Sequence, residues 1–258
     1  MNRYQKTFSE LKAKGEMGFM PFWMLGDPDL KSSQKIVEML AQHADLLELG
    51  IPFSDPLADG KTIQASADRA IKRGATVGKC LDIVGNLRVK FPEKPIGLLV
   101  YLNLILQFGI DDFFVECKKQ GVDSVLIPEL PEGEVSLVEN SAKGHEIDLI
   151  FLVSTNTPKE RVTSILEKAG GFLYAISTPG ITGAKEKIAT KTLEMIKDLK
   201  TQTEIPVCVG FGISSPKHLA LLKENGADGG IIGSKLFEFR NDINAMEKFC
   251  KACKKAIR

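Results

Sequence analysis

Two acidic residues in otherwise apolar or turn-forming surroundings are the strongest candidates for chemistry in this sequence. Glu48 interrupts the apolar run LLELG at 46–50, and Asp59 follows in the loop sequence PLADG. A carboxylate inside an apolar strand is costly unless it has a partner or an altered proton affinity. A structural ion pair would also explain Glu48, so that alternative stays open. Two carboxylates at one rim can divide general-acid and general-base work between them.

Glycine-rich turns are the second candidate. The segments GITG (180–183), GFG (210–212) and GS (233–234) each follow an apolar run, and Ser214, Ser215 and Ser234 add hydroxyl groups nearby. Glycine lets backbone N–H groups approach an anion, and barrel enzymes often bind phosphate after their last two strands. Any one of these segments alone is explained as a tight turn. Three at adjacent strand ends predict a phosphate site.

The elements that must position these residues form a regular alternation. Apolar runs typical of covered parallel strands alternate with amphipathic helical stretches. The expected strands are 19–25, 46–50, 96–102, 124–130, 149–154, 172–177, 206–211 and 229–234, and the clearest expected helices are 32–44, 76–91, 111–121, 158–170 and 216–226. Thr76 is expected to cap its helix and Pro158 to open one, while Gly121, Gly170 and Gly226 are expected at helix C-termini.

Eight strands, each followed by a helix and with no linker between them, predict a (β/α)8 barrel. We expect one barrel domain over 1–258 with an extra N-terminal helix. An open doubly wound sheet is the alternative, and it is weakened because no GxGxxG follows the first strand. In a barrel, the carboxylates and the glycine turns all fall at the C-terminal ends of strands, where barrel enzymes place their chemistry.

Composition narrows the range of functions. The chain has 258 residues, with 34 Lys and Arg against 33 Asp and Glu, a net charge of +1. Nucleic acid is not an expected partner, because the basic excess that attracts phosphate backbones is missing. The longest apolar stretch, 96–106, is too short for a membrane span. With a polar N-terminus, the sequence predicts a cytoplasmic protein that does not bind membranes.

No metal site is expected. The five cysteines are scattered, and Cys250 and Cys253 have CxxC spacing without a second pair of ligands. That spacing places both thiols on one face of a terminal helix, which we expect to be exposed, so that serine at both positions should be tolerated. His43 and His218 are expected to cap helices or to face solvent.

At these residues the sequence resembles a known family. The segment LLELGIPFSDPLADG (46–60) closely resembles the signature of tryptophan synthase alpha subunits. Similar segments are 21–29, 62–70, 95–105, 121–131, 177–185 and 210–216. The resemblance implies a lyase that cleaves indole-3-glycerol phosphate to indole and glyceraldehyde 3-phosphate. It also implies a beta subunit partner in an alpha2beta2 complex, with no cofactor in this chain and pyridoxal phosphate in the partner.

The resemblance also assigns roles to residues. Glu48 is the implied general acid and base, and Asp59 the implied acceptor of the indole N–H. The implied substrate-binding residues are Phe22, Leu99, Tyr101, Leu126 and Tyr174 around indole, Gly183, Gly212, Gly233 and Ser234 at phosphate, Phe211 beside them, and Thr182 on a loop closing over Asp59. For the two tyrosines, ordinary packing at the barrel rim is the alternative.

Four positions depart from the family pattern. They are Met24, Lys61, Leu102 and Glu129, where the family usually has a small hydroxyl residue, proline, alanine and aspartate. A shift of about 1 Å at a reacting group can reduce the rate about a hundredfold. A second hypothesis is therefore an impaired barrel that still activates the beta subunit. A different phosphate-binding barrel, such as an isomerase, is disfavoured by the segment that joins Glu48 and Asp59.

Overall fold

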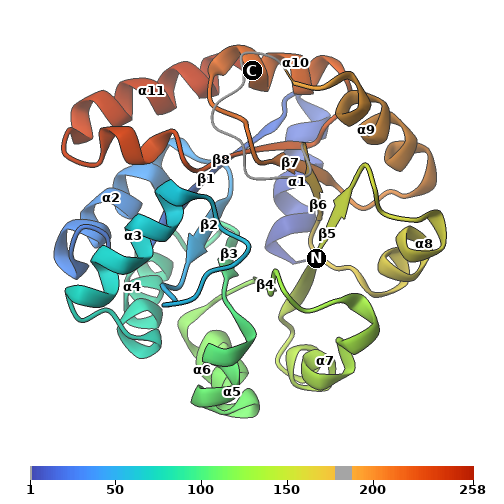
Figure 1. The fold of residues 1–258 in the computed structure, drawn as a ribbon. Coiled ribbons are helices and arrows are strands. Elements are labelled where there is room, and N and C mark those ends of the chain that lie inside the picture. The colour runs from blue at the N-terminus through green and yellow to red at the C-terminus, as the bar shows by residue number, and fades with distance from the viewer. Residues whose placement is uncertain (1, 178–187) are drawn as a thin grey trace.

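Eight parallel strands close into a barrel in chain order, and the predicted (β/α)8 fold is confirmed (Figure 1). The computed structural model describes residues 2–177 and 188–258. The strands are β1 Gly18–Met24, β2 Leu47–Gly50, β3 Ile96–Leu99, β4 Ser124–Leu126, β5 Asp148–Ser154, β6 Leu173–Ile176, β7 Val207–Gly210 and β8 Gly229–Ile232. Pairing of β1 with β8 closes the barrel.

Helices surround the strands (Figure 1). They are α1 Arg3–Ala13, α2 Leu30–His43, α3 Lys61–Lys72, α4 Val77–Lys90, α5 Leu102–Phe108, α6 Ile110–Gln120, α7 Ser136–Gly144, α8 Lys159–Lys168, α9 Thr190–Gln202, α10 Pro216–Glu224 and α11 Ile243–Ala256. Short 3-10 turns, η1 Glu132–Glu134 and η2 Leu236–Phe239, follow β4 and β8. We call the end of the barrel at the carboxyl ends of the strands the mouth, and the opposite end the floor.

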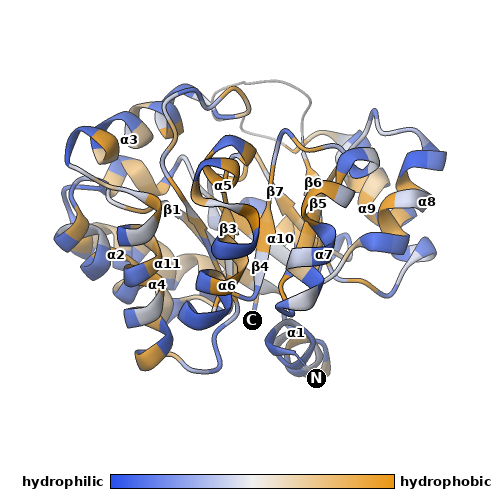
Figure 2. Cartoon of the chain, turned by 90° about the horizontal axis from the view of Figure 1, so that it is seen from below, coloured by the Kyte–Doolittle hydropathy of each residue, from blue (hydrophilic) through white to orange (hydrophobic). Residues whose placement is uncertain are grey.

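The predicted extra N-terminal helix closes the floor. Figure 2 shows α1 beneath the strands, near both chain termini. The Tyr4 hydroxyl of α1 lies 2.8 Å from Ser124 Oγ of β4 in a buried contact. A Cβ atom added at Gly97 of β3 would lie 2.9 Å from the same hydroxyl, so glycine there leaves room for the tyrosine. α1 therefore fills the lumen at the floor.

Register places the catalytic candidates inside the lumen. Phe22 of β1 pairs with Glu48 of β2, and Glu48 pairs in turn with Gly97 of β3. Paired residues of neighbouring parallel strands point to the same side of the sheet. Since Gly97 faces Tyr4 in the lumen, Glu48 and Phe22 face the lumen as well.

The expected elements are all present, but several strands end early. The run 96–102 stops as a strand at Leu99 because Tyr101 already precedes α5, and the run 124–130 stops at Leu126. Thr76 caps α4 and Gly121 takes a left-handed conformation after α6, both as predicted. Pro158 precedes α8 instead of opening it, and Gly170 was wrongly expected at its C-cap, which is Ala169.

The expectation for the two C-terminal cysteines was wrong about exposure. Cys250 and Cys253 share one face of α11, as predicted, but that face is fully buried. Burial also raises the pKa of the Cys250 thiol to about 12, which leaves it unreactive at neutral pH. His218 is likewise buried rather than solvated, and its Nδ1 accepts the Ser214 N–H at 3.3 Å. His43 instead pairs with Glu247 of α11 at 3.1 Å.

Candidate active site

The fold brings Glu48 and Asp59 into electrostatic contact near the mouth. Glu48 lies on β2 and Asp59 between β2 and α3, and these residues are only 4% and 6% exposed. Burial raises the pKa of Glu48 to about 8, and the neighbouring Asp59 adds to the shift. At neutral pH the Glu48 carboxyl therefore carries a proton, which is the form that a general acid requires.

Asp59 is the ionised member of the pair. Burial raises the pKa of its carboxyl to about 6, a hydrogen bond with the Tyr101 hydroxyl opposes that rise, and Glu129 adds to it. Its Oδ2 atom is buried and has no hydrogen-bond partner among the residues that the structure describes. A buried acceptor without a donor is destabilising, and such atoms are rare outside functional sites. This oxygen is suited to accept an N–H group from a ligand.

Tyr101 holds the segment that carries Asp59. Its hydroxyl accepts the Ala58 N–H at 3.2 Å, and its ring stacks on Phe53 with the ring centroids 5.1 Å apart. The Asp59 carbonyl also accepts a hydrogen bond from Gln64 Nε2 at 2.8 Å. Phe53 and Gln64 were not predicted. Both lie in segments that resemble the family, Phe53 in 46–60 and Gln64 in 62–70, and that was the available signal.

The predicted indole-binding residues include strand neighbours of Glu48, since Phe22 pairs with Glu48 and Leu99 pairs with Gly50 of the same strand. Phe22, Leu99, Leu126 and Tyr174 come from four strands and are all buried. Burial raises the pKa of the Tyr174 hydroxyl well above its usual range, and Glu48 is the next contributor. A Cβ atom at Gly50 would lie 2.7 Å from Phe22 Cζ, so glycine leaves room for that ring.

The predicted phosphate turn after β7 adopts an unusual backbone conformation. Phe211 and Gly212 both have positive φ, at 63° and 73°, and Phe211 is 40% exposed after β7. Positive φ is uncommon for a bulky residue and often marks a functional turn. Gly233 and Ser234 lie in the turn after β8. Ser215 caps α10 by accepting the His218 N–H. Thr182 and Gly183 lie outside the described residues.

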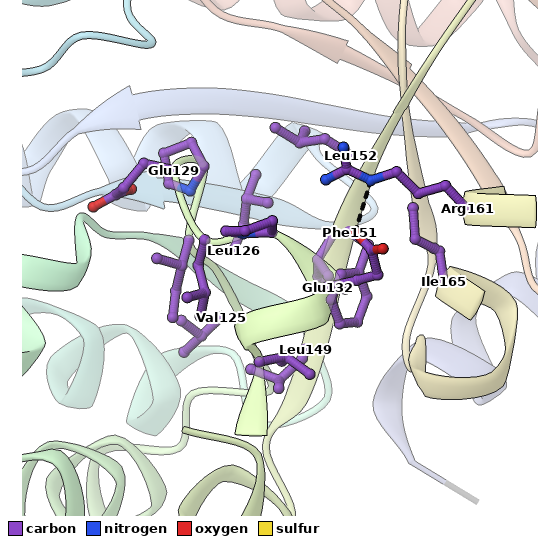
Figure 3. A pocket seen from close by; sticks show the side chains of 15 residues that line it. Val125, Leu126, Glu129, Glu132, Leu149, Phe151, Leu152, Arg161 and Ile165 are labelled. Carbon is purple, nitrogen blue, oxygen red and sulfur yellow. Dashed lines mark hydrogen bonds and ion pairs between the residues drawn. The ribbon is translucent and has the colours of Figure 1, made fainter. Parts of the chain in front are cut away.

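A cavity of about 210 Å³ opens between β4 and β5 (Figure 3). The two strands pair only from Ser124 to Leu126, and the cavity lies where they diverge. Leu126 and Leu152 form part of its wall. Arg161 of α8 lies 2.7 Å from Glu132 of η1 across one side of it. The cavity therefore lies beside Leu126 and is lined by charged as well as apolar side chains.

The sequence predicts neither a membrane-spanning helix nor a metal site. Within residues 2–177 and 188–258, no helix is long and apolar enough to cross a membrane. No group of three or more His, Cys, Asp or Glu side chains in those same ranges is arranged to hold a metal ion.

Comparison with known proteins agrees with the geometry. The family model described as tryptophan synthase alpha chain matches residues 8–256. The tryptophan synthase alpha chain of Methanocaldococcus jannaschii is 45% identical over 246 residues, which are 94% of this chain and 87% of that relative. The chain belongs to the tryptophan synthase alpha chain family.

Solved structures of tryptophan synthase chains have the same fold. The alpha subunit from Legionella pneumophila has a TM-score of 0.91 and 32% identity, with 100% of this chain and 98% of that chain covered. A chain of the tryptophan synthase complex from Pyrococcus furiosus has a TM-score of 0.84 and 32% identity, with 92% and 98% covered. The family resemblance, the barrel fold and the lyase function expected of a tryptophan synthase alpha chain are therefore confirmed.

The four departures from the tryptophan synthase pattern leave the carboxyl pair in place. Met24 is buried in the lumen and would contact a Cβ at Gly50. Glu129 accepts the Leu102 N–H at 2.5 Å, so its carboxylate provides an acceptor for a backbone N–H in the first turn of α5. Lys61 is the exposed first residue of α3. Because Glu48 and Asp59 remain buried with raised pKa values, the impaired-barrel alternative is not favoured.

Proposed function

We propose that Glu48 and Asp59 carry out retro-aldol cleavage of indole-3-glycerol phosphate to indole and glyceraldehyde 3-phosphate. The observation that carries this proposal is a pair of buried carboxyls with different pKa values, about 8 for Glu48 and about 6 for Asp59. One is protonated and the other ionised at neutral pH. Environments that separate two pKa values in this way are typical of acid–base pairs.

The reaction needs a proton donor first and a proton acceptor second. Protonation of indole C3 by Glu48 creates a positive charge on the ring, which the Asp59 carboxylate stabilises through the indole N–H. The bond from C3 to the glycerol carbon then breaks, and its electrons restore the aromatic ring. The glycerol hydroxyl gives its proton back to Glu48 as the aldehyde forms, so the catalyst is regenerated. The buried Oδ2 of Asp59 has no hydrogen-bond partner within residues 2–177 and 188–258, which supports this role.

The surrounding residues suit the two ends of this substrate. Phe22, Leu99, Tyr101, Leu126 and Tyr174 offer apolar surface for indole, as binding sites for aromatic ligands usually do. At the phosphate end, we assign Gly183, Gly212, Gly233 and Ser234 to the phosphate, with Phe211 beside it and Thr182 closing over Asp59. The glycine turns after β7 and β8 support the phosphate assignment.

The partner is a further part of the proposal. We infer that this chain associates with a beta subunit that holds pyridoxal phosphate and uses the indole, in an alpha2beta2 complex located in the cytoplasm. A relative from Pyrococcus furiosus was solved as a tryptophan synthase complex, which supports the inference. Asp59 and the exposed Leu57 lie on the segment 52–61 at the mouth, so docking there would order the segment that carries a catalytic group.

The decisive measurement is indole release from indole-3-glycerol phosphate by the purified chain, alone and with beta subunit. We expect slow release alone and faster release with the partner. No release in either case, with normal activation of the beta subunit, would support the impaired-barrel alternative instead. Calorimetric titration with beta subunit should give tighter binding when glycerol phosphate is added. An unchanged affinity would reject coupling between the two sites.

A further inference from the structure

A buried aspartate that the proposed reaction does not use lies at the end of β1. Asp27 is fully buried, and its carboxylate accepts three hydrogen bonds, all from α3. Ser66 Oγ donates at 2.7 Å, and Arg69 donates through Nε and Nη2, both at 2.8 Å. A two-point contact from arginine fixes orientation as well as distance. One helix therefore satisfies a charge that would otherwise be costly to bury.

That helix is one of two supports of Asp59, and Tyr101 is the other. α3 begins two residues after Asp59, and the Ile63 and Gln64 N–H groups both bond to the Gly60 carbonyl. The Gln64 side chain reaches back to the Asp59 carbonyl at 2.8 Å. On the other side of Asp59, the half-buried Ala58 donates its N–H to Tyr101, and Leu57 before it is 88% accessible. A displacement of α3 would therefore carry the Asp59 backbone with it.

The first turn of α3 is not stabilised by a capping side chain or by an acidic residue. Its N-cap is Gly60, which has no side chain to bond the free N–H groups, and its first turn contains no acidic residue. Lys61 instead puts a positive charge at the positive end of the helix dipole. The placement of α3 must therefore come from tertiary contacts.

The turn before Asp27 gives α3 a second tertiary contact. Gly26 has φ of +87°, and a Cβ atom there would lie 2.7 Å from Ala75 Cβ and 3.2 Å from Ala70 Cβ. The turn after β1 thus packs against the last turn of α3 and the residues that follow it, while Asp27 bonds to Ser66 and Arg69 of the same helix.

We propose that Asp27, through Ser66 and Arg69, is a positioning residue that sets α3 in the orientation aiming the Asp59 carboxylate at the reacting ring. This inference rests on the proposed role of Asp59. Asp27 does not contact substrate. Its effect on cleavage is transmitted through α3 and the first-turn bonds to Gly60 and Asp59.

The test compares Asp27→Asn and Arg69→Lys with a matched pair at the floor. Asp123 also accepts hydrogen bonds from an arginine, with Arg88 Nη2 at 2.7 Å, but it lies at the opposite end of the barrel. Asp123→Asn and Arg88→Lys are therefore the controls. We expect the Asp27 and Arg69 variants to lower kcat about 10- to 100-fold, the scale of an ångström-sized misplacement. Binding of glycerol phosphate should be unchanged, and the controls should keep the wild-type kcat.

A double-mutant cycle with Asp59→Asn separates this inference from the proposal on which it depends. If Asp27 acts through Asp59, adding Asp27→Asn to Asp59→Asn causes little further loss. Asp59→Asn with normal activity would remove the proposed role of Asp59 itself. An impaired Asp59→Asn with losses that multiply in the double variant would overturn the positioning role alone.

The pH profile gives a second readout that a loss of stability would not change. With α3 displaced, Asp59 becomes better hydrated, so the acidic limb of the kcat/KM profile should move to lower pH in Arg69→Lys. That variant keeps the charge beside Asp27 and is the less disruptive of the two. A lower melting temperature with kcat and pH profile unchanged in the folded protein would show that the contact is purely structural.

Discussion

The floor and the mouth of this barrel use the same residue type in opposite ways. At the floor, Asp45, Asp123 and Asp228 each stand just before a strand and accept the N–H of the neighbouring strand, from Phe19, Ile96 and Val207. Each also pairs with basic side chains; Lys254 pairs with Asp45, Arg88 with Asp123 and Lys200 with Asp228. At the mouth, Asp59 Oδ2 has no partner in the described chain.

The difference shows how one fold separates stability from reactivity. A carboxylate that accepts several hydrogen bonds has its charge compensated by the donors. It stabilises the folded protein in its ionised form, and it has no free oxygen lone pair for a ligand. A carboxyl that is buried without such donors keeps a raised pKa and an unused lone pair. In this barrel Asp45, Asp123 and Asp228 at the floor are of the first kind, and Asp59 at the mouth is of the second. Asp27, also at the mouth, is of the first kind because α3 supplies its donors.

The sharpest test of this comparison is to neutralise one carboxyl at each end. Glu48→Gln and Asp59→Asn should each lower indole release at least about a hundredfold, the scale of a lost general acid or base. Asp228→Asn at the floor should lower the melting temperature and leave kcat unchanged. Glycerol phosphate binding, measured by calorimetry, should survive in all three variants. Full activity in Glu48→Gln would refute the mechanism.

The pH dependence of kcat/KM should report the same pair. The active form has Asp59 ionised and Glu48 protonated, so activity should fall below about pH 6 and above about pH 8, the pKa values of the two carboxyls. Each limb should approach tenfold per pH unit. Because a substrate phosphate also titrates near pH 6, the control is Asp59→Asn, which should lose the enzyme's part of the acidic limb. A flat profile from pH 5 to 9 contradicts the assignment.

A smaller effect is expected from the phosphate turn after β8. A Cβ atom at Gly233 would lie 3.3 Å from Phe22 Cδ1, so Gly233→Val should crowd the ring and obstruct the approach of phosphate. We expect KM to rise about tenfold while Glu48 chemistry continues, a loss of about 1.4 kcal/mol in binding. Gly78→Ala, where nothing lies within 4 Å, is the control. Unfolding with normal KM in the remaining folded protein would make Gly233 a turn residue only.

The smallest effect is expected at Asp148, the floor carboxyl that departs from the pattern. Burial raises its pKa to about 6, and the neighbouring Asp123 adds to the shift. A raised pKa means that the folded state prefers the neutral form, so stability is lost as pH rises from about 4 through about 6. Asp148→Asn should therefore raise the melting temperature at pH 7.5 by about 2–4 °C, for roughly 1 kcal/mol. An equal gain at pH 3.5 would refute this explanation.

Much of this structure could be predicted because its signals are local. Apolar runs of strand length alternate with helical stretches, and Glu48 stands out since a carboxylate within an apolar strand needs an explanation. The strand ends were overextended, because apolar residues such as Ile127 continue past the last ladder bond. That Asp59 Oδ2 has no hydrogen-bond partner among the described residues depends on how the loop packs, and sequence spacing does not reveal this.

Features that depend on distant contacts could not be predicted. The spacing of Cys250 and Cys253 predicted that they share one face of a helix, but not whether that face is buried. The lysines around them suggested that it faces solvent, whereas α11 packs on α2 and α10. Asp27 lies in the strand-end sequence LGDPD, and its partners Ser66 and Arg69 come about forty residues later. Their three-residue spacing marks one face of a helix, but nothing in it indicates the carboxylate they meet.

The pairing of β1 with β8, which closes the barrel, determines when the active site is completed during folding. Gly18 of β1 pairs with Gly229 of β8, so the lumen stays open on that side until β8 has been synthesised and has paired. Contacts between such distant segments form late, since the entropy of the intervening chain must be lost first. Until then water reaches Glu48 from the open side, and its carboxyl behaves like that of an ordinary glutamate. Its capacity to act as an acid near neutral pH is acquired only when the last strand closes the ring.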